Sequence, residues 1–371
     1  MENFVVSARK YRPLGFDEVV GQEHITTTLK NAIEKNHLGQ ALLFCGPRGV
    51  GKTTCARILA RMVNGFEAQG TDSSNAMNIY ELDAASNNSV DDIRNLIDQV
   101  RFPPQHGKFK VYIIDEVHML STQAFNAFLK TLEEPPAYAI FILATTEKHK
   151  VIPTILSRCQ IFDFNRIQIS DITHHLVRIA KNEGIEAEQE ALHLIAQKAD
   201  GALRDALSIF DLIVTFSSGG KVTYADTISN LHILDYDYYF KVTDALLQEN
   251  ISQCLLIFDE ILRQGFDGHQ FLTGLAEHLR NVLVCKDAVT ISLLEVSDNV
   301  RARYAEQAQA ASTGFLLSVM NILSQADVQY KASKNQRLHV EMALMKSAHI
   351  PSAMQLAASL SSGEALKKKV M

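Results

Sequence analysis

The sequence reads GPRGVGKT from Gly46 to Thr53, which matches the pattern Gly-x4-Gly-Lys-Ser/Thr of the phosphate-binding loop of nucleoside triphosphatases. An apolar run typical of a buried strand precedes it at residues 41–45, and residues 54–62 have helical spacing. Glycines let consecutive backbone N–H groups turn toward phosphate oxygens, and the helix start adds its positive dipole end. This context favours a nucleotide site over a glycine-rich turn with a surface lysine. The residues expected to bind the nucleotide here are Gly46, Pro47, Arg48, Gly49, Val50, Gly51, Lys52, Thr53 and Thr54.

The catalytic and metal-binding side chains are expected at two places. In the loop, Lys52 would reach the β- and γ-phosphates of ATP, and the hydroxyl of Thr53 would bind Mg²⁺. Asp115 and Glu116 end another apolar strand, the position of a Walker B motif. Asp115 would hold Mg²⁺ through water, and Glu116 would orient or deprotonate the attacking water. An acidic pair at a strand end is weak evidence alone, but it becomes strong when a phosphate loop lies upstream.

Two threonines and one histidine near this site are harder to interpret. Thr145 and Thr146 end a further predicted strand, close to the expected position of the γ-phosphate. A hydroxyl there can sense that phosphate, but β-branched residues also simply suit a strand, and both interpretations stay open for each threonine. His118 follows the acidic pair, and we interpret it as structural.

Length and composition set the broad class. A chain of 371 residues is long for one hydrophobic core, so two or three domains are expected. Its content of 47% hydrophobic and 21% charged residues is ordinary for a soluble globular protein, and no apolar run approaches the roughly 20 residues that span a bilayer. The start has no signal-peptide pattern, so we expect a cytoplasmic protein without membrane contact. The net charge of −6 excludes a chain coated with positive charge, but not DNA binding by a local patch or an assembled surface.

The order of predicted elements indicates an α/β domain followed by helical domains. Strands are predicted at residues 41–45, 78–83, 110–116 and 139–146, alternating with helices at 89–100 and 122–132. Buried strands that alternate with helices imply a parallel sheet covered on both faces, with the ligand beyond the carboxyl ends of the strands. Three helices follow at about 170–183, where Ser170 would be the cap, 188–199 and 203–216, and the remainder is helical almost throughout.

Beyond these patterns, the chain resembles the gamma/tau subunits of bacterial DNA polymerase III, the motor subunits of the clamp loader and members of the AAA+ ATPase class. The resemblance covers roughly the first 210 residues in family order, and the helical remainder fits the family's collar domain by position. The matching segments are Arg9–Pro13, Val19–Glu23, Gly46–Thr53, Asp115–Leu120, Lys130–Pro136, Leu143–Thr146, Ser157–Cys159 and Gly201–Leu207.

The resemblance implies domains and further site residues. It implies an AAA+ P-loop core with a parallel sheet (residues 1–168), a three-helix lid (169–230), an all-α collar for oligomerisation (231–352) and a flexible tail (353–371). Arg158 matches the arginine finger that reaches the ATP of a neighbouring subunit, and such a finger is worth about 10³–10⁵ in rate. Arg204 matches the sensor 2 arginine that touches the phosphates in cis. From the residues alone, an arginine paired with Asp205 or with a helix end would be preferred. Val19 and Val20 match the segment that lines the adenine pocket.

The resemblance also implies a function. It implies an ATPase that uses ATP and Mg²⁺ to open the sliding clamp and load it onto primed DNA. Its partners would be the delta and delta-prime subunits, further copies of itself, the clamp and primer-template DNA. The alternatives are another AAA+ DNA motor, such as a branch-migration motor or an archaeal replication factor subunit, and a non-catalytic clamp-loader scaffold. The intact Gly51-Lys52-Thr53 and Glu116 disfavour the scaffold.

The sequence departs from the family pattern in two places. Gamma/tau subunits typically carry a four-cysteine zinc module between the phosphate-loop helix and the second strand, and residues 63–77 contain no cysteine. None of the five cysteines has Cys-x-x-Cys spacing, and a structural zinc site needs about four Cys or His ligands, so no zinc is expected. Residues 87–89 read Asn-Asn-Ser, where the family often presents basic residues toward DNA. Phosphate contact through amide and hydroxyl groups or through a helix N-terminus remains an option there.

Overall fold

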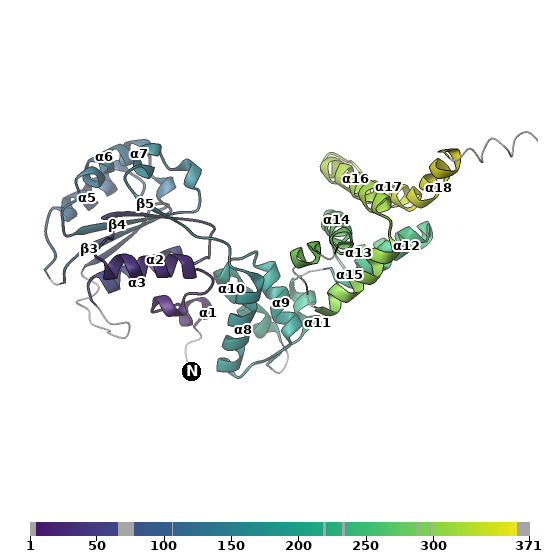
Figure 1. The fold of residues 1–371 in the computed structure, drawn as a ribbon, viewed down its shortest axis with the longest axis horizontal. Coiled ribbons are helices and arrows are strands. Elements are labelled where there is room, and N and C mark those ends of the chain that lie inside the picture. Colours follow the sequence, from purple (N-terminus) through teal and green to yellow (C-terminus); the bar gives the residue numbers. More distant parts are fainter. Residues whose placement is uncertain are drawn as a thin grey trace, which may run out of the picture. The chain divides into compact units, whose positions relative to one another are not determined.

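The computed structural model describes residues 5–65, 78–105, 107–217, 220–231, 234–287, 289–294, 296 and 298–361. The chain divides into two compact units, Met1–Thr223 and Tyr224–Met371 (Figure 1). Each unit has its own hydrophobic core. The candidate site lies in the first unit, so that unit is described in more detail.

A parallel five-stranded sheet forms the centre of the first unit. Its strands lie in the order β2-β3-β4-β1-β5 and are β1 (Ala41–Cys45), β2 (Ile79–Asp83), β3 (Lys110–Asp115), β4 (Ala139–Thr145) and β5 (Gln160–Asp163). Every residue of β1 and β4 is buried, as expected for strands covered on both faces. The predicted parallel sheet is therefore confirmed, with β5 as a strand that the sequence patterns did not reveal.

Helices cover both faces of the sheet, and side-chain alternation divides the core between them. On one face, Tyr112, Ile114 and Leu143 pack with α5 (Val90–Val100), α6 (Thr122–Glu133) and α7 (Pro153–Leu156). On the other face, Phe44 and Ile113 pack with α2 (Glu23–Glu34) and α3 (Lys52–Val63). Figure 1 shows the two groups of helices on opposite sides of the strands. Ser89 caps α5 through a capping box with Asp92.

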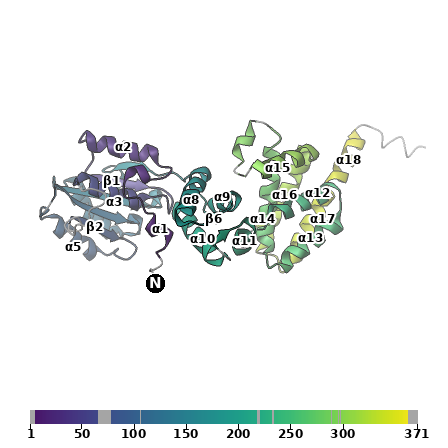
Figure 2. The same cartoon turned by 90° about the horizontal axis from the view of Figure 1, so that it is seen from below.

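A three-helix lid completes the first unit. It consists of α8 (Ile169–Glu183), α9 (Gln189–Lys198) and α10 (Leu203–Phe216), with short strands β6 (Glu186–Ala187) and β7 (Lys221–Val222) beside them. The expected cap at Ser170 is wrong, because Ser170 lies inside α8. The N-cap of this helix is Gln168, whose side chain makes no cap hydrogen bond within the described residues. Gly184 ends α8 in the left-handed conformation, at φ 68°. Figure 2 shows the three helices grouped beside α1 (Ser7–Lys10).

Specific polar contacts tie the lid to the rest of the first unit. The backbone N–H of Ser7 in α1 donates to Asp211 Oδ2 of α10 over 2.7 Å. Lys10 forms an ion pair with Glu183 at the end of α8, at 2.5 Å. The backbone N–H of Arg204 donates to the carbonyl of Gly49 over 3.3 Å, so the lid contacts the phosphate loop itself.

The second unit is helical in its described residues. Its elements are α11 (Tyr224–Leu231), α12 (Tyr236–Leu247), α13 (Ile251–Arg263), α14 (Gly268–Val284), η4 (Thr290–Leu293), α15 (Asp298–Ala310), α16 (Thr313–Tyr330), α17 (Gln336–Ala348) and α18 (Ile350–Ser361). Its core includes Phe258, Phe271 and Tyr304. The expected boundary between lid and collar was residue 230, whereas α11 already belongs to this unit. Residues 353–361 of the expected tail are part of α18, and residues 362–371 lie outside the described residues.

None of the helices in the described ranges is long and apolar enough to cross a membrane.

Candidate functional site

The phosphate loop joins β1 to α3, and its conformation requires glycine. Gly46 has φ 149°, and a Cβ there would lie 2.4 Å from the carbonyl oxygen of Phe164. Gly51 is the N-cap of α3 at φ 104°, a left-handed conformation that other residues rarely adopt. The glycines of the motif therefore place the start of α3, which begins at Lys52, at the end of the loop.

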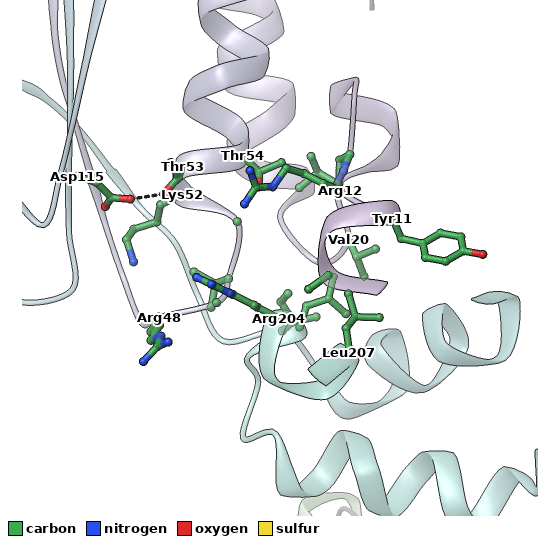
Figure 3. A pocket seen from close by; sticks show the side chains of 18 of the residues that line it. Tyr11, Arg12, Val20, Arg48, Lys52, Thr53, Thr54, Asp115, Arg204 and Leu207 are labelled. Carbon is green, nitrogen blue, oxygen red and sulfur yellow. Dashed lines mark hydrogen bonds between the residues drawn. The ribbon is translucent and has the colours of Figure 1, made fainter. Parts of the chain in front are cut away.

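A pocket opens over this loop (Figure 3). Figure 3 shows Lys52, Thr53 and Asp115 on one side of it and Tyr11, Val20 and Leu207 on the other. One side is therefore polar and charged, whereas the other is largely apolar. The lining residues come from the N-terminal segment, the loop, the end of β3 and the lid, and they are Ala8, Tyr11, Arg12, Pro13, Val19, Val20, Arg48, Gly49, Val50, Gly51, Lys52, Thr53, Thr54, Asp115, Glu116, Ile167, Leu203, Arg204 and Leu207.

Lys52 is a buried cation at the polar side of the pocket. Its side chain is 6% exposed, and Nζ donates to the carbonyl oxygens of Gly46 and Pro47, both over 2.8 Å. Burial lowers the pKa of Lys52, and the nearby carboxylates of Glu116 and Asp115 oppose that effect. A buried ammonium is costly without anions, so the site favours a negatively charged ligand.

Thr53 and Asp115 form the oxygen-rich part of the site. The hydroxyl of Thr53 donates to Asp115 Oδ2 over 2.6 Å, and the other carboxylate oxygen accepts the backbone N–H of Glu116 over 2.9 Å. A hydroxyl and a carboxylate are hard oxygen ligands, which Mg²⁺ prefers together with water and phosphate oxygens. These two residues therefore fit a magnesium ion held beside a bound triphosphate.

Glu116 lies where the ends of β3 and β4 meet. Its backbone has φ 48°, an uncommon conformation for a side chain other than glycine. Its Oε2 accepts the hydroxyl of Thr146 over 2.9 Å and the backbone N–H of the same residue over 3.3 Å. The carboxylate is thus held in one orientation at the pocket wall.

Three arginines add positive charge to the pocket. Arg12, Arg48 and Arg204 line it, and their guanidinium groups form no ion pair with any of the described residues. The pKa of Arg12 is lowered, first by burial and then by the positive charges of Arg57 and Arg204. Together with Lys52, these groups give a pocket with an excess of cations, as a triphosphate requires.

Three family profiles match consecutive parts of the chain. Residues 21–168 match "DNA polymerase III, delta subunit", and residues 171–219 match "DNA polymerase III clamp loader subunit, ATPase lid domain". Residues 222–362 match "DNA polymerase III subunits gamma and tau domain III". A DNA polymerase III subunit tau of Bacillus subtilis (strain 168) is 39% identical over 374 residues, which cover 98% of this chain and 66% of that protein.

The chain belongs to the gamma/tau family of DNA polymerase III subunits. The subunit tau of Escherichia coli (strain K12) is also 39% identical, over 76% of this chain and 45% of that protein. The chain thus spans about half to two thirds of the length of these relatives. Among solved structures, the Thermotoga maritima RuvB Holliday junction branch migration motor is similar at 21% identity, with a TM-score of 0.48 over 64% of this chain and 79% of that one.

The structure gathers most of the predicted site residues around one pocket. Val19, Val20, Asp115, Glu116 and Arg204 line it together with the loop from Arg48 to Thr54. Gly46 and Pro47 contribute the carbonyls that accept Lys52. Arg204 forms no ion pair with Asp205 in the described part of the chain.

Besides Gly46 and Pro47, the predicted residues Thr145, Thr146 and Arg158 do not line this pocket. Thr145 is fully buried, and its hydroxyl oxygen lies 3.0 Å from His118 Nδ1 and accepts the backbone N–H of Glu147. Arg158 follows α7, where it forms an ion pair with Glu133 at 2.5 Å and donates to the carbonyl of Thr154 over 2.8 Å. Arg158 therefore makes no contact with the pocket of its own protomer.

Sequence reasoning missed several residues of the site. Tyr11 and Arg12 lie in the segment quoted for the family resemblance, but no local pattern gave them a role. Leu207 and Ile167 close the apolar side, and only the lid's position over the loop brings them there. The prediction that no zinc is bound concerns residues 63–77, most of which lie outside the described residues. The described ranges contain no cluster of His, Cys, Asp or Glu that could hold a metal.

Proposed function

We propose that the chain is the ATPase motor subunit of a bacterial clamp loader. The observation that carries the proposal is the single pocket in which Lys52, Thr53, Asp115 and Glu116 meet Arg204 of the lid, in a chain of the gamma/tau family. A phosphate loop, a paired carboxylate strand end and a lid arginine are the parts that ATP binding and hydrolysis need.

The cationic side of the pocket would bind the triphosphate. Backbone N–H groups of the loop surround the phosphates, and the start of α3 adds its dipole. Lys52 would exchange its contacts with Gly46 and Pro47 for the β- and γ-phosphates, while Arg204 contacts the phosphates from the lid. Val19, Val20 and Leu207 would pack against the base.

Thr53 and Asp115 would hold Mg²⁺, with Asp115 acting through water. When bound, the ion neutralises charge on the phosphate oxygens. Glu116 would orient or deprotonate the attacking water, and its position at the pocket wall suits that role.

Arg158 would complete the site of a neighbouring protomer. In support, its guanidinium lies outside the pocket of its own chain, and it is 33% exposed at the end of α7. Hydrolysis at each interface would thus use Glu116 from one protomer and Arg158 from the next. Thr146 rather than Thr145 would be the hydroxyl that responds to the γ-phosphate, because it donates to Glu116.

The proposed partners are further copies of this chain, the delta and delta-prime subunits, the sliding clamp and primer-template DNA, in the cytoplasm. The test supplies these partners and measures how much clamp is retained on primed circular DNA. Wild-type protein with ATP is expected to load clamps, and Lys52→Ala is expected to load none. Normal ATP turnover without any clamp loading would favour another AAA+ motor, and clamp loading without ATP would favour a scaffold.

A further inference from the structure

His118 bridges two carboxylates at the back of the site. It lies in the short helix η2 (Val117–Met119), and its side chain is 6% exposed. Its Nδ1 is 3.4 Å from Glu116 Oε2, and its Nε2 is 3.1 Å from Glu147 Oε2. Nδ1 also lies 3.0 Å from the hydroxyl oxygen of Thr145, so this nitrogen faces Thr145 and Glu116 together. The ring therefore connects the expected catalytic carboxylate to a second acidic residue outside the pocket.

Glu147 is a fixed anchor for this ring. It precedes the short helix η3 (Lys148–Lys150), and its carboxylate accepts a hydrogen bond from Lys150 over 2.8 Å. That hydrogen bond is the main reason why the pKa of Glu147 is below its ordinary value. The backbone N–H of Glu147 donates to Thr145 Oγ1 over 3.0 Å, which joins the anchor to the end of β4. The carboxylate that Lys150 holds therefore lies at the nitrogen of the ring that faces away from Glu116.

The contacts of Glu116 distinguish its two carboxylate oxygens. Oε2 faces the backbone N–H and hydroxyl of Thr146 and the ring of His118. Within the described residues, Oε1 accepts no hydrogen bond and remains available for a water molecule. A general base works only when its acceptor oxygen is held in line with the proton that it removes.

We propose that His118 is a positioning residue that holds Glu116 in its working orientation, with Glu147 as the anchor. This inference rests on the proposed ATPase function. It goes beyond the interpretation of His118 as a structural residue, of which the simplest form is a side chain that fills space between the ends of β3 and β4. The two roles differ in what they predict for side chains of similar size.

The test compares four substitutions in the partner-supplied ATPase assay. His118→Ala is expected to lower kcat by about 10- to 100-fold while KM for ATP stays within about twofold, because a misplaced base impairs chemistry but not binding. Asn places its amide near the position of Nδ1, whereas Gln places it near that of Nε2. His118→Asn is therefore expected to retain more turnover than His118→Gln, and Glu147→Gln to lower kcat by less than His118→Ala. The matched control is His37→Ala, at an exposed histidine that lies before β1 and away from Glu116 and Glu147, and it should match the wild type.

The results distinguish a role of His118 in positioning Glu116 from a role in filling space. A space-filling role predicts that the longer Gln restores function at least as well as Asn, and that ranking would contradict the proposal. Loss of ATP binding in all the His118 variants would also contradict it, because it would show a structural role. Wild-type kcat in His118→Ala, with an active wild type, would overturn the inference alone. An inactive wild type would overturn the proposed function, and this inference with it.

Discussion

The hydroxyl of Thr53 donates to Asp115 Oδ2 over 2.6 Å and so joins the first turn of α3 to the end of β3. The two residues belong to separate motifs, and the contact brings the metal-binding oxygens of both to one point. Without the hydroxyl, Asp115 alone would have to hold the ion. We expect Thr53→Ala to weaken Mg²⁺-dependent ATP binding by about 10-fold or more, as loss of a hydrogen-bonding group at a charged site implies.

The check is ATP affinity measured across a Mg²⁺ titration. Thr53→Ser keeps the hydroxyl and should stay within about threefold of the wild type. An Ala variant whose affinity and Mg²⁺ dependence equal those of the Ser variant would show that the hydroxyl has no part in metal binding.

Arg204 should distinguish ATP from ADP. It lines the pocket from α10 and has no ion-pair partner among the residues that the structure describes, so its charge is available to the phosphates. We expect Arg204→Ala to weaken ATP binding by roughly 10- to 100-fold, with a smaller effect on ADP, because charge-assisted hydrogen bonds are worth about 1.5–3 kcal/mol. Equilibrium titration with both nucleotides measures this. As a control, Lys198→Ala removes an exposed lid cation on α9 and should leave the affinities for ATP and ADP unchanged. If both variants lost the same affinity for ATP, the effect would come from the overall charge of the lid and not from contact of Arg204 with the phosphates.

The division of labour between protomers predicts complementation. Glu116→Gln lacks the base and Arg158→Ala lacks the finger, so assemblies of either variant alone should turn over ATP at least about 10²-fold more slowly. Co-expressed variants form some interfaces with an intact Glu116 on one side and an intact Arg158 on the other. ATPase assays of these mixed assemblies should therefore recover a measurable fraction of wild-type turnover. If the mixture stays as inactive as its components, the finger does not act across an interface.

The second unit should lose stability in acid because of His278. Its Nε2 donates to Gln307 Oε1 over 2.7 Å, and its buried Nδ1 has no hydrogen-bond partner among the described residues. Burial lowers the pKa of His278 from 6.5 to about 4. The unfolded chain therefore takes up a proton near pH 6.5, while the folded unit takes it up only near pH 4. Stability is full above pH 6.5 and falls by up to roughly 3 kcal/mol as the pH drops to 4.

Urea unfolding followed by circular dichroism at pH 7.5 and 4.5 measures this loss. His278→Gln should show a smaller drop between the two pH values than the wild type, whatever its stability at neutral pH. The exposed His349 offers a control, and His349→Gln should keep the wild-type drop. The same drop in all three proteins would assign the acid sensitivity to other groups.

The parts of the fold that could be predicted are those whose sequence pattern reflects burial on all sides. Strands β1, β3 and β4 are continuous apolar runs because both of their faces are covered, and four of the strand predictions agree with the structure to within a residue or two. Strand β5 was missed because it lies at the edge of the sheet, where only Phe162 of its four residues is buried.

The site could be predicted where its functional residues are consecutive in the sequence and form a recognisable motif. The loop and the Asp115-Glu116 pair are such cases, whereas Arg158 was given a role only through the resemblance to the family. The contacts of His118 could not be predicted, because they depend on β3 and β4 being neighbours in the sheet, which brings Glu147 and Thr145 to its ring. Arg12 is a similar case, because it reaches the pocket only through the docking of α1 on the lid.

The most direct test of the account is the steady-state rate of ATP hydrolysis by Glu116→Gln and wild-type protein, with clamp-loader partners and primed DNA present. The account predicts that both bind ATP with affinities within about threefold, and that the variant hydrolyses it at least about 10²-fold more slowly. Equal rates for the two proteins, or a wild type that binds ATP in this assembly and never hydrolyses it, would contradict the account.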